Sequence, residues 1–177
     1  VSEHQQTINW QEIDTNTYSF VVIRSGYGDT LTGAIDQYFY ENIKQAKKRG
    51  LKVGVYHYSY AMSAQEAKQE AEFVLSILEG IDLDLPVYFD FEDSCHDILS
   101  SNEMNKIAKA FLTTIENSHY STGLYANSDR LSYLSSDLLD QLDIWIASYG
   151  QEPLYYGTIK LWQYTNQGKI SGISTDV

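Results

Sequence analysis

Predicted strands and amphipathic helices alternate along this chain, and the alternation constrains its fold more than any other feature. Runs of β-branched and apolar residues cover positions 19–24, 53–58 and 85–93. The segments between and after these runs carry apolar residues at helical spacing. Strands that alternate with helices form parallel sheets, and strands without a polar face are typical of sheets covered on both sides. The sequence therefore predicts an α/β fold.

Two of the helices carry clear start signals. Ser63 with Glu66, and Ser100 with Glu103, have the spacing of a capping box. An earlier helix is expected to end at Gly50, since glycine suits the position after a helix.

The later segments complete a pattern of about six strands. Residues 122–126, 144–147 and 159–164 are predicted strands, and residues 128–142 form a helical or turn-rich piece. Six strands with few regular helices favour an irregular, TIM-barrel-like β/α barrel over an eightfold one, with a doubly wound open sheet as the alternative. We expect one domain over residues 1–177.

Composition excludes several classes of function. The 177 residues carry a formal net charge of -12, which disfavours binding to nucleic acid or to anionic membranes. No stretch approaches the roughly 20 apolar residues of a membrane span, so membrane insertion is not expected. The N-terminus lacks the features of a signal peptide, although a signal removed earlier would leave no trace.

The segment 85–93 carries two carboxylates, Asp90 and Glu92, that are separated by one residue. Alternate residues of a strand share a face, so Asp90 and Glu92 should lie together while Phe89 and Phe91 face the other way. Neighbouring carboxylates oppose each other's ionisation, so one pKa is raised and that group keeps a proton near neutral pH. Glycoside cleavage needs such a proton donor, together with negative charge beside an oxocarbenium-like centre.

Other predicted strands also end in polar or aromatic side chains. In β/α barrels, catalytic groups lie at the C-terminal ends of the strands. The side chains at those ends are Arg24, His57, Tyr58, Asp90, Glu92, Tyr125, Asn127, Tyr149, Trp162 and Tyr164.

Three other interpretations of these residues stay open. The acidic pair could bind Arg24 or cap a helix. A hard cation could bind some of His57, Asp90, Glu92, Asp93 and His96, although paired histidines at helical spacing are absent. Cys95 lies beside His96, but adjacent side chains rarely hydrogen-bond to each other, which disfavours a nucleophile.

Several motifs follow one another in a specific order from end to end of the chain. They are Val1 to Gln5 with Ile8-Asn9-Trp10, Phe20 to Gly28, Gly54 to Ser59, Pro86 to Asp93, Gly123 to Asn127, Trp145 to Ala147, and Leu161 to Tyr164. In these motifs the chain resembles the lysozymes of glycoside hydrolase family 25, the N-acetylmuramidases, a group that includes phage endolysins.

The resemblance implies cleavage of the β-1,4 bond between N-acetylmuramic acid and N-acetylglucosamine, with no cofactor or metal. It makes Glu92 the general acid, with Asp90 orienting the substrate's N-acetyl group in a retaining, substrate-assisted reaction. Tyr58, Tyr125, Tyr149 and Trp162 would line the sugar subsites, and Arg24 would hold the carboxylates in place. The partner would be bacterial peptidoglycan, and the enzyme a monomer that is extracellular or at the cell wall, either secreted or released by phage lysis.

The resemblance also implies two further cleft aspartates that the given sequence does not contain. The family pattern has an aspartate directly before Val1-Ser2, and an Asp-x-Asn segment where the sequence reaches Val177. We therefore expect the given sequence to be a domain trimmed at both ends. Two alternative functions remain, an endo-N-acetylglucosaminidase or chitinase-like glycosidase, and a non-catalytic sugar-binding module for the cell wall.

Overall fold

A mixed sheet of seven strands forms the framework of the computed structural model, which describes residues 1–29 and 31–177. The strand order is β2-β1-β3-β4-β5-β6-β7, and every neighbouring pair is parallel except β1 with β2. The strands are β1 (Phe20–Tyr27), β2 (Ala34–Ile35), β3 (Lys52–Tyr58), β4 (Val87–Asp90), β5 (Thr122–Asn127), β6 (Asp143–Ala147) and β7 (Ile159–Gln163). The predicted α/β class is confirmed.

The helices begin where the capping signals predict. Ser63 Oγ accepts a hydrogen bond from the Glu66 amide at 3.2 Å, and Ser100 with Glu103 forms a complete capping box. The α-helices are α1 (Phe39–Lys48), α2 (Ala64–Ile77), α3 (Ser101–Glu116), α4 (Ser128–Ser132) and α5 (Ser136–Leu139), with short 3-10 helices η1 (Glu3–Gln5) and η2 (Ser94–Ile98). Within the described residues, no helix has the length and apolar content to cross a membrane.

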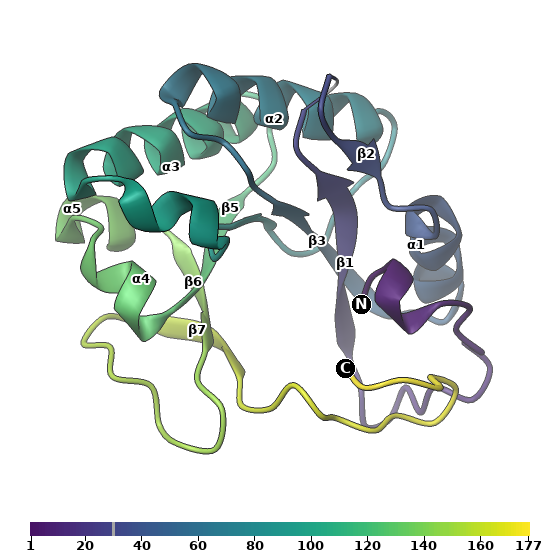
Figure 1. Ribbon diagram of the computed structural model, residues 1–177. Coiled ribbons are helices and arrows are strands. Elements are labelled where there is room, and N and C mark those ends of the chain that lie inside the picture. The colour runs from purple at the N-terminus through teal and green to yellow at the C-terminus, as the bar shows by residue number, and fades with distance from the viewer. Residues whose placement is uncertain (30) are drawn as a thin grey trace.

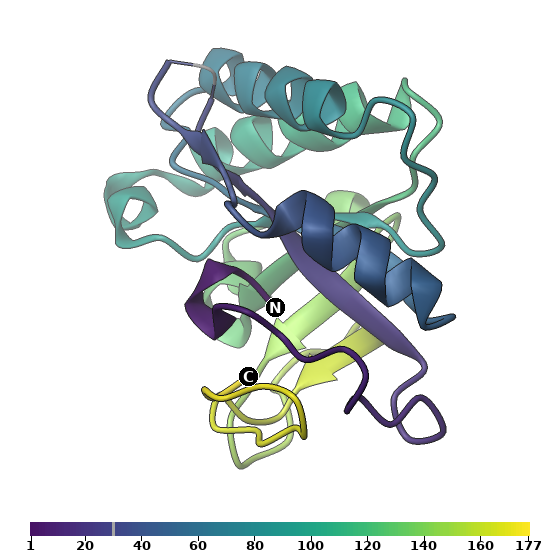
Figure 2. The ribbon, with the colours of Figure 1, turned by 90° about the vertical axis from the view of Figure 1, so that its right-hand side faces the viewer.

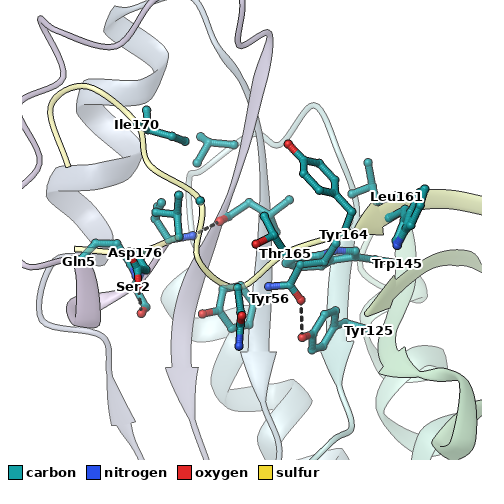
Figure 3. Close-up of a pocket in the computed structure, with 18 of the residues that line it drawn as sticks. Ser2, Gln5, Tyr56, Tyr125, Trp145, Leu161, Tyr164, Thr165, Ile170 and Asp176 are labelled. Carbon is teal, nitrogen blue, oxygen red and sulfur yellow. Dashed lines mark hydrogen bonds between the residues drawn. The ribbon is translucent and has the colours of Figure 1, made fainter. Parts of the chain in front are cut away.

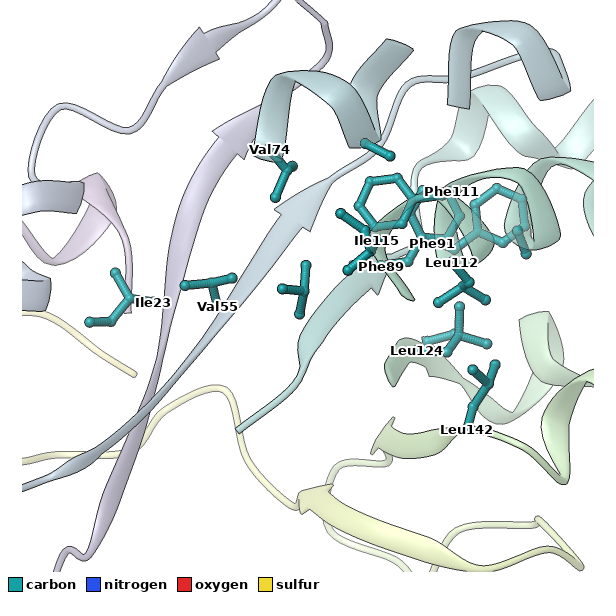
Figure 4. Close-up of a cluster of buried hydrophobic side chains, with 14 of the residues drawn as sticks. Ile23, Val55, Val74, Phe89, Phe91, Phe111, Leu112, Ile115, Leu124 and Leu142 are labelled. Atoms are coloured by element: carbon teal, nitrogen blue, oxygen red, sulfur yellow. The ribbon is translucent and has the colours of Figure 1, made fainter. Parts of the chain in front are cut away.

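One face of the sheet packs against the helices. Every α-helix contributes to a single buried cluster that also contains Ile23, Val55, Phe89 and Leu124 from the strands. Figure 4 shows part of this cluster, in which the Phe89 and Phe111 rings lie 4.4 Å apart. In Figures 1 and 2 the helices lie outside the curved sheet. Helices on one face are typical of a β/α barrel, whereas a doubly wound sheet carries them on both faces.

The other face of the sheet is concave and faces the two end segments of the described chain. In Figure 1 the segment after β7 runs past the open side of the sheet towards β1. The Arg24 amide donates to the Val1 carbonyl at 2.9 Å, so the N-terminal residue lies beside β1. Gln5 Nε2 donates to the Asp176 carbonyl at 2.8 Å, which joins the two end segments.

Two strands differ from the prediction. β1 continues through Gly26 and Tyr27, where a loop was expected, because these residues pair with Ile35 and Ala34 of β2. A Cβ at Gly26 would lie 2.2 Å from the Ala34 carbonyl oxygen, so only glycine permits this close approach. β4 ends at Asp90, so Glu92 lies just beyond the strand.

Candidate active site

A pocket of about 610 Å³ opens on the concave face of the sheet. It is lined by residues from β1, from β3 to β7 and from both end segments (Figure 3). Five of the seven predicted site residues line it, namely Asp90, Glu92, Tyr125, Tyr149 and Trp162. Phe89 and Phe91 belong to the buried cluster on the opposite face, as strand alternation predicts. The pocket is therefore the candidate active site.

Asp90 is the buried member of the acidic pair. Its side chain is 2% exposed, and its Oδ1 atom has no hydrogen-bond partner among the described residues. Burial raises the pKa of Asp90 well above its ordinary range; Glu92 and Asp93 raise it further, and Arg24 acts in the opposite direction. A buried carboxyl oxygen without a partner is costly for folding alone. It points to a ligand group as the missing partner.

Glu92 lies at the mouth of the pocket, where it is exposed to solvent. Surrounding protein atoms still desolvate it enough to raise its pKa; the Tyr125 hydroxyl lowers the pKa, and Asp93 adds to the rise. The pair therefore has one deeply buried carboxyl and one that solvent and substrate reach. A raised pKa favours the protonated form that a general acid needs.

Arg24 contacts neither member of the acidic pair. Its Nε donates to Asp36 Oδ2 at 3.0 Å, and its terminal nitrogen donates to Glu3 Oε1 at 2.5 Å. Arg24 is not among the residues that line the pocket. Its guanidinium instead ties β1 to the N-terminal segment, so the interpretation that the acidic pair merely binds Arg24 finds no support.

Tyr58 lies beside the acidic pair and not in the lining of the pocket. It is in register with Asp90 on the neighbouring strand, and its hydroxyl donates to Asp93 Oδ2 at 2.9 Å. The contact holds Tyr58 against the segment that carries Glu92.

Many lining residues were not predicted as site residues, and three of them are polar or aromatic side chains on β3, β6 and β7. Tyr56, Trp145 and Gln163 all line the pocket, and Gln163 Oε1 accepts a hydrogen bond from the Tyr125 hydroxyl at 2.7 Å. For two of them the sequence held a signal, since Tyr56 lies two positions before Tyr58 on β3 and Gln163 two positions after Leu161 on β7.

The candidate metal ligands are divided between the two faces of the sheet. His57 is buried on the helix side, where its ring nitrogens contact Ser25 Oγ at 3.1 Å and the Gly28 carbonyl at 2.8 Å. His96 is buried against Phe91, with Nε2 3.1 Å from the Ala61 carbonyl. Among the described residues, no three His, Cys, Asp or Glu side chains are grouped as metal ligands. Both histidines therefore serve the core.

Cys95 does not have the surroundings of a nucleophile. Burial raises the pKa of its thiol to about 12, and Asp93 adds to the rise. A reactive cysteine needs the opposite shift.

Comparisons with known proteins agree with this geometry. A family model described as Glycosyl hydrolases family 25 matches residues 1–173. The autolytic lysozyme of Clostridium acetobutylicum is 25% identical over 171 residues, which cover 96% of this chain and 50% of that protein. Lysozyme M1 of Streptomyces globisporus is 27% identical over 195 residues, covering 100% of this chain and 64% of that protein.

A solved structure shows the same fold. The modular autolysin LytC of Streptococcus pneumoniae superposes with a TM-score of 0.84 at 27% identity, covering 99% of this chain and 44% of that chain. The structure of LytC in complex with a synthetic peptidoglycan ligand gives a TM-score of 0.83. The chain thus spans between 44% and 64% of the length of these three proteins.

Proposed function

This chain belongs to glycosyl hydrolases family 25, and from that membership we propose that it is the catalytic domain of a peptidoglycan muramidase. The substrate bond is the β-1,4 linkage between N-acetylmuramic acid and N-acetylglucosamine. The observation that carries the proposal is the acidic pair, one carboxyl buried and one exposed, in a pocket lined by aromatic side chains. The curated relatives are named lysozymes, and LytC has been solved with a peptidoglycan ligand.

Glu92 is the proton donor in this proposal. The sugar alkoxide is a poor leaving group, so the glycosidic oxygen must receive a proton as the bond breaks. Glu92 lies at the solvent side of the pocket, and desolvation by the surrounding protein raises its pKa, which favours the protonated form that donates to the leaving oxygen. The same group then accepts a proton from the water that completes hydrolysis.

Asp90 acts on the substrate's N-acetyl group. Its Oδ1 has no hydrogen-bond partner among the described residues, and the side chain faces the pocket. A carboxyl there can accept the amide N–H of the N-acetyl group and orient the amide oxygen towards the anomeric carbon. Substrate-assisted reactions of this kind proceed with retention and need no carboxylate nucleophile from the enzyme.

Aromatic side chains supply the sugar subsites. Tyr125, Tyr149 and Trp162 line the pocket; Tyr149 and Trp162 are 47% and 42% exposed. Exposed rings next to a catalytic pair present flat apolar faces on which sugar rings stack.

The proposed partner is bacterial peptidoglycan, and the proposed location is the cell wall or the extracellular space.

Glu92→Gln is the direct test of the proposal. The amide keeps the size of the side chain but holds no transferable proton, so the rate of cell-wall lysis should fall about 10²–10⁴-fold. The matched control is Glu79→Gln, an exposed glutamate that does not line the pocket, which should keep full activity. Lysis by Glu92→Gln at the rate of the parent protein would refute the proposal.

The cleavage products separate the muramidase from its alternative. Mass spectrometry of digested peptidoglycan should show new reducing ends on N-acetylmuramic acid. Reducing ends on N-acetylglucosamine would instead identify an endo-N-acetylglucosaminidase. Binding of muropeptides without any turnover would identify a sugar-binding module.

A further inference from the structure

Glu70 on α2 is a buried carboxylate outside the pocket. Its side chain is 2% exposed; Oε2 accepts a hydrogen bond from Ser59 Oγ at 2.6 Å, and Oε1 accepts one from the Tyr60 amide at 2.9 Å. Among the described residues, no Lys, Arg or His nitrogen forms a salt bridge with it. Burying a carboxylate without a cation is costly. The two hydrogen bonds that Glu70 accepts offset part of this cost, and they show which groups the carboxylate holds.

Those bonds hold the segment that directly follows β3. The Ser59 amide donates to the Asp90 carbonyl at 3.1 Å, and the Ala61 amide donates to Ser59 Oγ at 3.1 Å. His96 Nε2 lies 3.1 Å from the Ala61 carbonyl on the other side. Residues 59–61 are thus fixed between the catalytic strand β4 and the carboxylate of Glu70.

Tyr58, the last residue of β3, and Tyr60, in this segment, place two aromatic rings near Asp93. Tyr58 and Tyr60, which we call the aromatic rim, flank Ser59, and their ring centroids lie 5.2 Å apart. The Tyr58 hydroxyl binds Asp93, and the Tyr60 side chain is 46% exposed. Because Glu70 contacts Ser59 and the Tyr60 backbone, it determines where both rings stand relative to Asp90.

We propose that Glu70 is a positioning residue that fixes the aromatic rim against the acidic pair, so that its loss weakens substrate binding more than bond cleavage. The inference rests on the proposed function in one respect, since it takes a sugar chain as the ligand of the rim. Neither tyrosine of the rim is among the residues that line the pocket, so Glu70 acts on a different part of the site from the lining aromatics such as Tyr125.

Titration of Glu70 adds a pH dependence to this role. Burial raises the pKa of Glu70 to about 7; its bonds to Ser59 and Tyr60 lower the pKa, whereas Asp29, two residues after β1, and Glu66, on α2, raise it. The facing groups of η2 are the Cys95 thiol, whose own pKa Glu70 raises, and the His96 ring behind Ala61. Above pH 7 the carboxylate accepts both hydrogen bonds. As the pH falls through about 7, the carboxylate takes up a proton and becomes a weaker acceptor for the Ser59 hydroxyl and the Tyr60 amide, so the rim is held less firmly.

Glu70→Gln tests the role, with Ser59→Ala as a second variant that removes only the hydroxyl. For soluble peptidoglycan fragments at pH 8, both should raise KM about fivefold and change kcat less than twofold. In the parent protein KM should rise as the pH falls from 8 to 6, and in Glu70→Gln it should not. Glu72→Gln is the matched control, because Glu72 lies on the exposed face of the same helix and, within the described residues, its only ion pair is with Lys68.

Hydrogen exchange supplies a measurement that needs no substrate. The Tyr60 and Ala61 amides should exchange faster in both variants, while the amides within α2 keep their protection. This result is independent of whether the protein cleaves peptidoglycan, so a failure of the proposed function is seen separately, as no lysis by the parent protein. Unchanged KM or unchanged exchange in a folded Glu70→Gln overturns the inference. If Glu70→Gln does not fold, the same two measurements on Ser59→Ala decide.

Discussion

The Tyr125 hydroxyl donates to Gln163 Oε1 at 2.7 Å and so joins β5 to β7 across the intervening strand β6. In Figure 3 the dashed line that ends at the labelled Tyr125 marks this bond. The same hydroxyl lies near Glu92 and lowers the pKa of that carboxyl. Tyr125 therefore couples the shape of the pocket to the protonation of the proposed acid.

Tyr125→Phe should move the alkaline limb of the activity profile. Without the hydroxyl the pKa of Glu92 rises, and a general acid stays protonated to a higher pH. We expect the alkaline limb of kcat/KM to shift upwards by about one pH unit or less, because Glu92 is partly solvated. The measurement is kcat/KM between pH 5 and 9. Tyr133→Phe, which changes an exposed tyrosine, is the control, and an unmoved limb in Tyr125→Phe would contradict the prediction.

Asp90→Asn should change how stability depends on pH. The folded pKa of Asp90 lies above its ordinary value of 3.8, so the unfolded chain releases this proton at a lower pH than the folded protein. The stabilising contribution is complete below the unfolded pKa and is lost as the pH rises, by at most about 1.4 kcal/mol per pH unit. Asparagine does not titrate, so that loss disappears.

Urea unfolding at pH 5 and pH 7 measures this effect. The free energy of unfolding of Asp90→Asn minus that of the parent protein should be larger at pH 7 than at pH 5. Glu70 titrates in both proteins and is not coupled to Asp90, so its contribution cancels in the comparison. A difference that stays constant across these pH values would show that Asp90 is ionised in the fold. The Asp90→Asn variant should lose cell-wall lysis at both pH values.

The strands and main helices of this fold are readable from sequence because their signals are local. Ser63 and Ser100 mark the starts of α2 and α3 within one residue, since a cap and its partner lie three positions apart. β2 was missed for the opposite reason. Its two residues have no strand pattern of their own and become a strand only by pairing with Gly26 and Tyr27. Such pairing depends on a close backbone approach that spacing alone does not reveal.

The candidate site also divides into features with a local sequence signal and features that depend on long-range contacts. Strand alternation predicted that Asp90 and Glu92 share a face, because side-chain direction follows from the strand itself. The partner of Arg24 was not predictable. Its charge is matched by Asp36 and Glu3, which come from segments whose positions depend on how the N-terminal residues fold back onto β1. Glu70 was not predicted either, because its position in the helical pattern of α2 does not distinguish it from the other residues of the helix.

Arg130→Lys should reduce activity although it keeps the charge. The buried Arg130 guanidinium donates to the Asp93 carbonyl at 3.1 Å and to Asp97 Oδ1 at 2.6 Å, and it lies over the Phe91 ring. These contacts fix the backbone on both sides of Glu92. A lysine ammonium cannot make the two bonds and the stacking contact in that geometry. We expect kcat to fall about tenfold, measured on soluble peptidoglycan fragments, with KM little changed. An unchanged kcat would show that the Glu92 segment is held by other contacts.

Asp36→Asn should destabilise the fold through the pair with Arg24. Three donors converge on the two Asp36 carboxylate oxygens, namely Arg24 Nε at 3.0 Å, the Glu3 amide at 2.7 Å and the Tyr38 amide at 3.0 Å. An asparagine turns its NH2 group towards at least one of these donors and leaves the buried Arg24 charge with Glu3 alone. The free energy of unfolding should fall by about 3 kcal/mol.

A double-mutant cycle with Arg24→Met isolates this pair. Once the guanidinium is absent, the Asp36 substitution no longer strands a buried cation, so the double variant should lose less stability than the sum of the two single losses. Urea unfolding of the four proteins measures the difference. Strictly additive losses would mean that Asp36 stabilises the fold through the Glu3 and Tyr38 amides. In that case β1 is joined to the N-terminal segment by backbone contacts, and the Arg24 charge contributes little to the join.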